Sequence, residues 1–217
     1  MRETFHGDLA RLGEQLADMC GMAAKSMRQA SRALLTADLP LAERVLTSDV
    51  ELDGARRACE DHAHSLLALQ APVARDLRTI LGAVYCAEKI ERMGDLAAHI
   101  ANAARFTHPV HTVPAEFEDV FTELGEISAS MADRVGELIK GGAAGAFAEL
   151  DMTDHAVDTL HARVLTTITG KGWPHGVQSA TNLALVARFY ERFADQAVSV
   201  AKRLEFAETG QTPTSGA

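Results

Sequence analysis

Four pairs of acidic residues, each with three residues between its members, are the strongest candidates for chemistry in the chain. Side chains four residues apart on a helix differ by about 40° around its axis, so both carboxylates of a pair point the same way. Oxygen ligands of this kind suit hard cations such as Mg²⁺, Mn²⁺, Ca²⁺ and iron. The candidate metal ligands are therefore Asp49, Asp53, Glu91, Asp95, Asp154, Asp158, Glu191 and Asp195.

The pairs follow the same order in both halves of the chain: an Asp-x-x-x-Asp pair and then a Glu-x-x-x-Asp pair. Asp154 lies 105 residues after Asp49, whereas Glu191 lies 100 residues after Glu91, and one altered loop absorbs this difference. A single pair is weak evidence, because such pairs are frequent on solvated helix faces. Their repetition in order indicates an internal repeat, and each half is predicted to form a four-carboxylate site on two facing helices.

The acids border the apolar stripes of their segments. Glu91 follows Ala87 by one turn and Asp95 adjoins Gly94, and both small residues belong to the apolar stripe. Carboxylates in such positions are costly to desolvate unless something compensates them. Three interpretations remain open: a bound multivalent cation, neutralisation by neighbouring arginines, or a solvated face on a purely structural bundle. The arginines concerned are Arg56, Arg57, Arg92, Arg188 and Arg192.

Six helical segments are predicted to position these acids, because prolines and glycines interrupt the helical periodicity between them. Aromatic residues make up only 5% of the chain, which favours closely packed helices over sheets. The fold class is predicted to be all-α, with two tandem three-helix bundles related by a pseudo-twofold repeat. The predicted helices are 3–36, 39–69, 72–106, 115–140, 143–169 and 174–207. The predicted domains are 1–108 and 114–207, followed by a disordered tail at 208–217.

Composition excludes several classes of function. A net charge of −9 argues against nucleic-acid binding, because few cations are available to displace counterions from phosphates. Cys20, Cys59 and Cys86 share no CxxC spacing and are predicted to be free buried thiols. No signal peptide or membrane-spanning run is recognised, so a cytoplasmic protein without membrane insertion is expected. No P-loop, HExxH or nucleophile motif occurs, and the chain is predicted not to be an enzyme.

At the acidic motifs the sequence resembles the PhoU family of bacterial phosphate-uptake regulators, and the resemblance runs from residue 1 to about residue 207. The Thr-Pro-Ser tail and alanine-rich composition point to an actinobacterial, PhoY-like branch. The stretches that carry the resemblance are Arg75-Asp76-Leu77-Arg78, Ala87-Glu88-Lys89-Ile90-Glu91-Arg92-Met93-Gly94-Asp95-Leu96-Ala97 and Arg188-Phe189-Tyr190-Glu191-Arg192-Phe193-Ala194-Asp195-Gln196-Ala197.

The resemblance implies a homodimer of such bundles with multinuclear metal sites at the acidic motifs, reported with iron or zinc; Mn²⁺ and Mg²⁺ also suit the oxygen ligands. It implies a negative regulator of phosphate uptake and of the phosphate-starvation response. Such a regulator couples the Pst phosphate ABC transporter, through its PstB-type ATPase, to a PhoR-type sensor histidine kinase. The alternative is a carboxylate-bridged di-metal enzyme or metal-storage bundle, but the Glu-x-x-His motifs of ferritin-like sites are absent.

Arg75 and Arg78 lie one turn apart near a helix start. They are predicted either to dock an acidic partner surface or to be solvated arginines beside the first-turn acid Asp76. His99 and His155 adjoin acidic motifs, as extra metal ligands or as ordinary surface donors.

The second repeat departs from the first in three ways. The helix start at Trp173-Pro174-His175 lacks the Arg-Asp-Leu-Arg run. Ala194 replaces Gly94, and Arg188 replaces Glu88, which changes the local charge by two units. The two sites are therefore predicted to differ in affinity, with the second the weaker.

Overall fold

Six long α-helices form the part of the chain that the computed structural model describes, residues 2–214. A 3₁₀ turn, η1, precedes the fourth helix, and no strand occurs among the described residues. The predicted all-α class is confirmed. The elements are α1 (Arg2–Thr36), α2 (Leu39–Gln70), α3 (Ala74–Thr107), η1 (Ala115–Phe117), α4 (Glu118–Gly141), α5 (Ala146–Ile168) and α6 (Gly176–Thr209).

The helix boundaries follow from local chemistry. The Asp38 side chain accepts a hydrogen bond from the Leu41 backbone N–H at 2.9 Å and so caps the start of α2, where Pro40 occupies the first turn. Gly142 and Gly145 have φ of 102° and 76°, which a glycine adopts without strain, and they separate α4 from α5.

Four starts differ from the sequence-based boundaries by two or three residues. α3 begins at Ala74, residues 115–117 form a 3₁₀ turn rather than the first turn of an α-helix, α5 begins at Ala146, and α6 begins at Gly176. Pro174 precedes α6 in a loop, where the Trp173 indole N–H donates to the Gly176 carbonyl at 2.8 Å. These are shifts of about two to three residues, which local propensity does not resolve.

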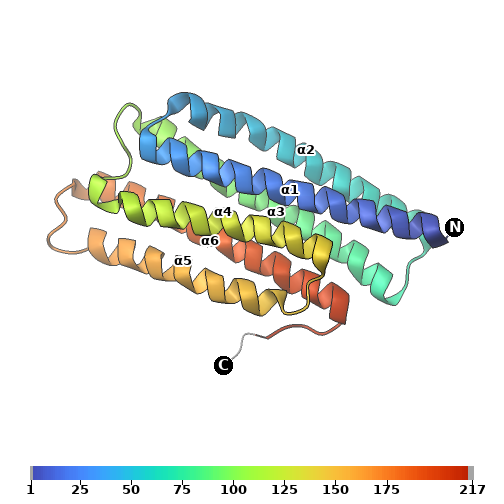
Figure 1. The fold of residues 1–217 in the computed structure, drawn as a ribbon. Coiled ribbons are helices and arrows are strands. Elements are labelled where there is room, and N and C mark those ends of the chain that lie inside the picture. Colours follow the sequence, from blue (N-terminus) through green and yellow to red (C-terminus); the bar gives the residue numbers. More distant parts are fainter. Residues whose placement is uncertain (1, 215–217) are drawn as a thin grey trace.

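The helices pack as two groups of three, α1–α2–α3 and α4–α5–α6. The groups meet where α1 lies against α4 and α3 lies against α6, so α2 and α5 are the outermost helices (Figure 1). One continuous apolar core, rich in alanine and leucine, runs through all six helices. Small residues allow the close approach of helices that this core requires.

The junction between the halves contains a buried polar contact. The Tyr190 hydroxyl of α6 donates to Ser31 Oγ of α1 at 2.9 Å, and Ser31 donates in turn to the Met27 carbonyl at 2.9 Å. A side chain on Gly125 of α4 would come within 2.6 Å of Ser31 Oγ, so glycine is required there. Burial of these hydroxyls is tolerated because each has a partner.

All three cysteines are free and buried, as predicted. Burial raises the pKa of the Cys59 thiol to about 11 and that of Cys86 to about 12. Since the thiolate is the reactive form, burial disfavours nucleophilic chemistry at these thiols, which pack in the core.

The C-terminal end of α6 lies two residues beyond the predicted end at 207. Glu208 is helical and accepts a hydrogen bond from the Ala143 N–H at 2.7 Å, and α6 ends at Thr209 with Gly210 in a left-handed conformation. Residues 211–214 have no regular structure. The rest of the predicted disordered tail, 215–217, lies outside the described residues.

Candidate metal-binding clusters

The first cluster comprises Asp49 and Asp53 of α2 and Glu91 and Asp95 of α3, which the packing of these helices brings together. Burial, followed by the charge of Asp95, raises the pKa of Asp49 above its usual value. Burial and then Asp95 likewise raise the pKa of Glu91. The charge of Asp95 on α3 therefore acts on Asp49 across the contact between the two helices.

The second cluster comprises Asp154 and Asp158 of α5 and Glu191 and Asp195 of α6. Burial raises the pKa of Asp154 to about 7, with further contributions from Asp158, Asp195 and Glu191. The pKa of Glu191 is raised by burial and then by Asp195, and the pKa of Asp195 is raised by burial. The charges of these acids therefore act on one another here as well, and burial is the main reason why the pKa of Asp154 is raised.

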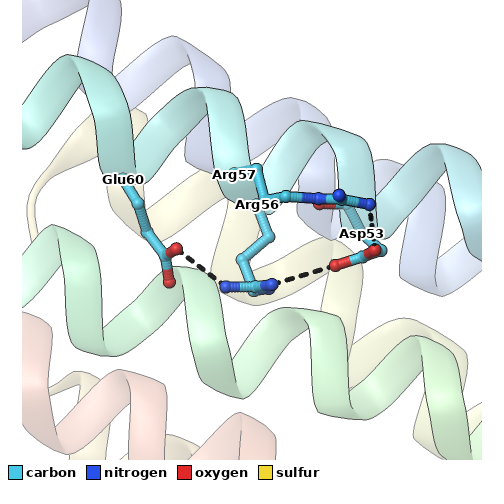
Figure 2. A network of polar contacts seen from close by, with 4 residues as sticks. All are labelled: Asp53, Arg56, Arg57 and Glu60. Carbon is cyan, nitrogen blue, oxygen red and sulfur yellow. Dashed lines mark hydrogen bonds and ion pairs between the residues drawn. The ribbon is translucent and has the colours of Figure 1, made fainter.

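Arginines compensate the first cluster. Arg56 donates to Asp53 Oδ1 at 3.0 Å and to Glu60 Oε2 at 2.7 Å, and Arg57 pairs with the second oxygen of Asp53 (Figure 2). The hydrogen bond from Arg56 is the main reason why the pKa of Asp53 is lowered. Arginine neutralisation is therefore realised at this carboxylate.

Asp95 is the second arginine-paired member of the first cluster. Arg92, three residues earlier on α3, donates to Asp95 Oδ2 at 2.6 Å. Asp53 and Asp95 thus each have an arginine partner from their own helix.

The second cluster has only one such partner among the described residues. Arg188 pairs with one oxygen of Glu191, whose side chain is only 12% exposed. The other oxygen, Oε2, and Asp154 Oδ1 are buried and have no hydrogen-bond partner. Buried acceptors without partners are costly, so the second cluster is the less satisfied of the two.

The fit of the clusters to a metal ion differs accordingly. Within the described residues, no three His, Cys, Asp or Glu side chains converge closely enough to hold an ion in this conformation. The two unpartnered oxygens of Asp154 and Glu191 fit a hard cation, because they are buried acceptors without a donor. In the first cluster, a cation would have to displace the arginines on Asp53 and Asp95.

The packing beside the clusters explains one departure between the repeats. A side chain on Gly94 would overlap the Leu52 Cδ2 methyl and approach Asp49 Oδ1 to 3.4 Å. The counterparts of Leu52 and Gly94 in the second half are Val157 and Ala194, both fully buried. Glycine with leucine and alanine with valine fill similar volumes, so the exchange is a matched repacking.

Neither candidate histidine forms a hydrogen bond or ion pair with a cluster acid, although the charge of His99 partly offsets the raised pKa of Asp49. The His99 ring packs on Phe189, with centroids 5.0 Å apart, and exposed His155 has its Nδ1 2.6 Å from the Asp151 carbonyl. Arg75 is exposed, whereas Arg78 is half-buried.

Two acids that the sequence pattern passed over belong to these networks. Glu60 shares Arg56 with Asp53, and Asp151 helps to raise the pKa of Asp154. Both lie one or two helical turns from a motif, and that spacing is the signal that could have found them.

The chain matches the family model described as "PhoU domain" twice, over residues 16–104 and 121–204. It is 41% identical over 213 residues to "Phosphate-specific transport system accessory protein PhoU homolog 1" of Mycobacterium leprae, which covers 98% of this chain and 96% of that protein. Identity is also 41%, over 98% of this chain and all of the relative, with PhoU homolog 2 of Mycobacterium tuberculosis.

Solved structures share the fold at lower identity. The PhoU crystal structure from Streptococcus pneumoniae superimposes with a TM-score of 0.86 at 23% identity, covering 97% of this chain and 99% of that one. PhoU from Pseudomonas aeruginosa gives 0.83 at 23% identity, covering 95% and 100%. At this identity the likeness concerns the fold alone.

Proposed function

Because the chain belongs to the PhoU domain family, we propose that it restrains phosphate uptake and the phosphate-starvation response by coupling a Pst-type phosphate transporter to a sensor histidine kinase. At the coarser level, it is an accessory and regulatory protein of phosphate-specific transport, because relatives 41% identical over nearly the whole chain carry that name. The observation that carries the finer proposal is that both repeats match the family, each with its acidic cluster.

The proposed partners are the PstB-type ATPase of the transporter and the PhoR-type kinase, and the proposed assembly is a homodimer. A regulatory rather than enzymatic role is supported by the names of the relatives, which are accessory proteins. No helix among the described residues has the length and apolarity needed to cross a bilayer. A cytoplasmic location, where the kinase and ATPase domains are accessible, is part of the proposal.

We propose that both clusters bind divalent or trivalent cations, Fe, Mn, Mg or Zn, and that the second cluster binds more tightly. Asp154 and Glu191 would hold the ion, supported by Asp158 and Asp195, and the cation would supply the positive charge that these carboxylates lack. The oxygen donors favour Mg, Mn and Fe over Zn, which prefers nitrogen and sulfur. The sequence comparison, which considered Arg188, predicted that the second cluster is the weaker site. The proposed order of the two clusters is the reverse, because the first cluster carries more arginines that compete with a cation.

Elemental analysis of protein purified without added metal, followed by calorimetric titration after EDTA treatment, tests the cation sites. Asp154→Asn with Glu191→Gln is expected to weaken binding at the tighter site by at least about tenfold. Asp53→Asn with Asp95→Asn is expected to affect only the weaker site. Glu123→Gln with Glu126→Gln, two exposed acids of α4, is the charge-matched control. Retention of no cation by the wild type would sink this part of the proposal.

Co-purification of the chain with the purified kinase and the transporter ATPase tests the regulatory coupling. Binding to both partners is expected, and it should weaken when Asp154 and Glu191 are replaced together or when EDTA is present. Failure to bind either partner would overturn the coupling. Binding that survives the loss of metal would show that partners do not read the acidic clusters.

A further inference from the structure

Helices α3 and α6 run antiparallel along a seam that carries three surface hollows. A side chain on Gly82, near the start of α3, would meet Ala207, near the end of α6, at 3.5 Å. Both residues line a hollow of about 690 Å³, to which Arg203 and the α1 acids Glu14 and Asp18 also contribute. A separate hollow of about 440 Å³, here called the basic hollow, is lined by Tyr85, Ser199, Lys202, Arg203, Phe206 and Thr212. The hollow at the opposite end of the seam has a volume of about 540 Å³.

The basic hollow and the hollow at the opposite end of the seam occupy equivalent places in the repeat but differ in charge. Counterparts on α3 and α6 lie 100 residues apart, so Tyr85 corresponds to Leu185 and Arg203 corresponds to Ala103. Tyr85 and Arg203 line the basic hollow, and Leu185 and Ala103 line the hollow at the opposite end. An aromatic ring is kept in both, whereas the cations occur only in the basic hollow. The other counterparts are Ser199 with His99, Lys202 with Asn102 and Phe206 with Phe106.

Two cations lie on one aromatic ring in the basic hollow. The Arg203 guanidinium lies 4.3 Å from the centre of the Tyr85 ring, and Lys89 Nζ lies 5.2 Å from the same centre. No more than about 10 Å can therefore separate the two charges. The ring holds the cations but does not neutralise them.

These cations have no acidic partner. Lys89, Lys202 and Arg203 form no ion pair with any carboxylate of the described chain. The acids near the end of α6 are engaged elsewhere: Glu205 accepts a hydrogen bond from the backbone at the start of α5, and Glu208 accepts one from the α4–α5 linker. In a protein of net charge −9, this leaves a local concentration of unpaired positive charge.

Arg78 adds a further cation next to the basic hollow. A side chain on Gly210, two residues before the lining residue Thr212, would meet the Arg78 guanidinium at 3.3 Å. The Nε atom of Arg78 is buried and has no hydrogen-bond partner. A buried cationic donor without an acceptor is costly, so an anion at this end of the seam would satisfy it.

We propose that the basic hollow binds an anion that carries phosphoryl groups. Three unpaired cations line or border the hollow and one more adjoins it, so a multivalent anion satisfies them where a single carboxylate could not. Guanidinium and ammonium groups are the usual protein ligands of phosphoryl oxygens. The ligand chemistry is shared by inorganic phosphate, a polyphosphate chain and the phosphates of a nucleotide. The site is separate from the acidic clusters and goes beyond the regulatory function proposed above.

Calorimetric titration of the full chain in EDTA-containing buffer tests this site without involving the cation sites. The probes are inorganic phosphate, tripolyphosphate and ATP, and saturable binding is expected for at least one of them. Lys89→Gln, which leaves the packing of Arg203 untouched, is expected to weaken binding severalfold, and Arg203→Gln with Lys89→Gln at least about tenfold. Arg163→Gln with Lys171→Gln, two exposed cations elsewhere, matches the change in charge and should leave affinity unchanged.

The outcomes separate the sources. Binding of inorganic phosphate supports a phosphate site, tighter binding of tripolyphosphate supports a chain, and a further gain with ATP supports a nucleotide whose base reaches the aromatic residues. The absence of saturable binding of all three up to about 10 mM would overturn the proposal. Equal affinity of the wild type and of the variant with Arg203→Gln and Lys89→Gln would also overturn it. These results are independent of the partner and metal experiments, because no metal or partner is present.

Discussion

The two acidic clusters share their motifs but differ in how their charge is compensated. Arg56 and Arg57 hold Asp53 in the first half, whereas the counterparts of these arginines in the second half are His161 and Ala162. Burial, and then the charge of Arg188, lowers the pKa of His161, so this histidine contributes little positive charge at neutral pH. The residues beside a repeated motif, and not the motif itself, decide whether its carboxylates are neutralised.

The packing behind the clusters differs from the charge, because there the two halves fill the same volume with different residues. Leu52 with Gly94 fills the space that Val157 with Ala194 fills in the second half. Volume is conserved across the repeat although charge is not, since a tightly packed core tolerates only matched changes.

Exchange of the glycine in the first half is expected to have the largest effect. Gly94→Ala places a methyl group against Leu52 and should cost about 1–2 kcal/mol, because overpacking exceeds the gain in helix propensity. Adding Leu52→Val, which copies the second half, should recover most of the loss. Urea denaturation of both variants and of Leu52→Val alone measures the coupling, and strict additivity would refute the matched repacking.

Asp154→Asn is expected to stabilise the metal-free protein at about pH 8 by about 1 kcal/mol, a value reduced for solvent screening. The folded-state pKa of about 7 lies above the usual value of 3.8, so the unfolded chain ionises first as pH rises. The contribution of the Asp154 carboxyl group to the free energy of unfolding is therefore fully present below about pH 4 and is lost as the pH rises through about 7.

Thermal unfolding in EDTA across this pH range measures that difference. The gain for Asp154→Asn should vanish near pH 4. The pKa of Asp53 is lowered in the folded protein, so its ionised carboxylate stabilises the fold above the usual pKa of 3.8. Asp53→Asn loses the arginine contacts and should therefore destabilise the protein at neutral pH, and this loss should shrink as the pH falls. Parallel pH profiles for the two variants would contradict the difference between the clusters.

Tyr190→Phe should cost about 1 kcal/mol, since it removes the buried hydrogen bond to Ser31 that joins the halves. Differential scanning calorimetry should still show one transition, because the core is continuous through both halves. Two separated transitions would instead indicate that the halves unfold independently. Ser31→Ala is the companion variant from the other side of the contact.

His161→Arg should have the smallest effect on stability, a few tenths of a kcal/mol, because an arginine near the surface forms weak ion pairs. It copies Arg56 into the second half and is expected to weaken cation binding there several-fold by supplying the missing charge. Titration with Mn²⁺ measures this change. Unaltered binding would mean that arginine and cation do not compete for these carboxylates.

Much of this arrangement follows from the sequence because it is local. Proline and glycine positions give six helices, and the spacing of four places both acids of a pair on one side of a helix. The order of the motifs gives the repeat and the facing of α2 with α3 and of α5 with α6. The starts of α5 and α6 lie three and two residues beyond the predicted positions, since capping depends on the folded loop.

Only the tertiary structure decided what surrounds the motifs. The packing of α1 on α4 and of α3 on α6 brings Tyr190 to Ser31 and Arg203 to Tyr85, residues distant in the sequence. It also left Asp154 Oδ1 without a partner while Asp53 gained two. Helix periodicity is set by hydrogen bonds between neighbouring residues, whereas desolvation and ion pairing depend on distances between helices, which no local pattern encodes.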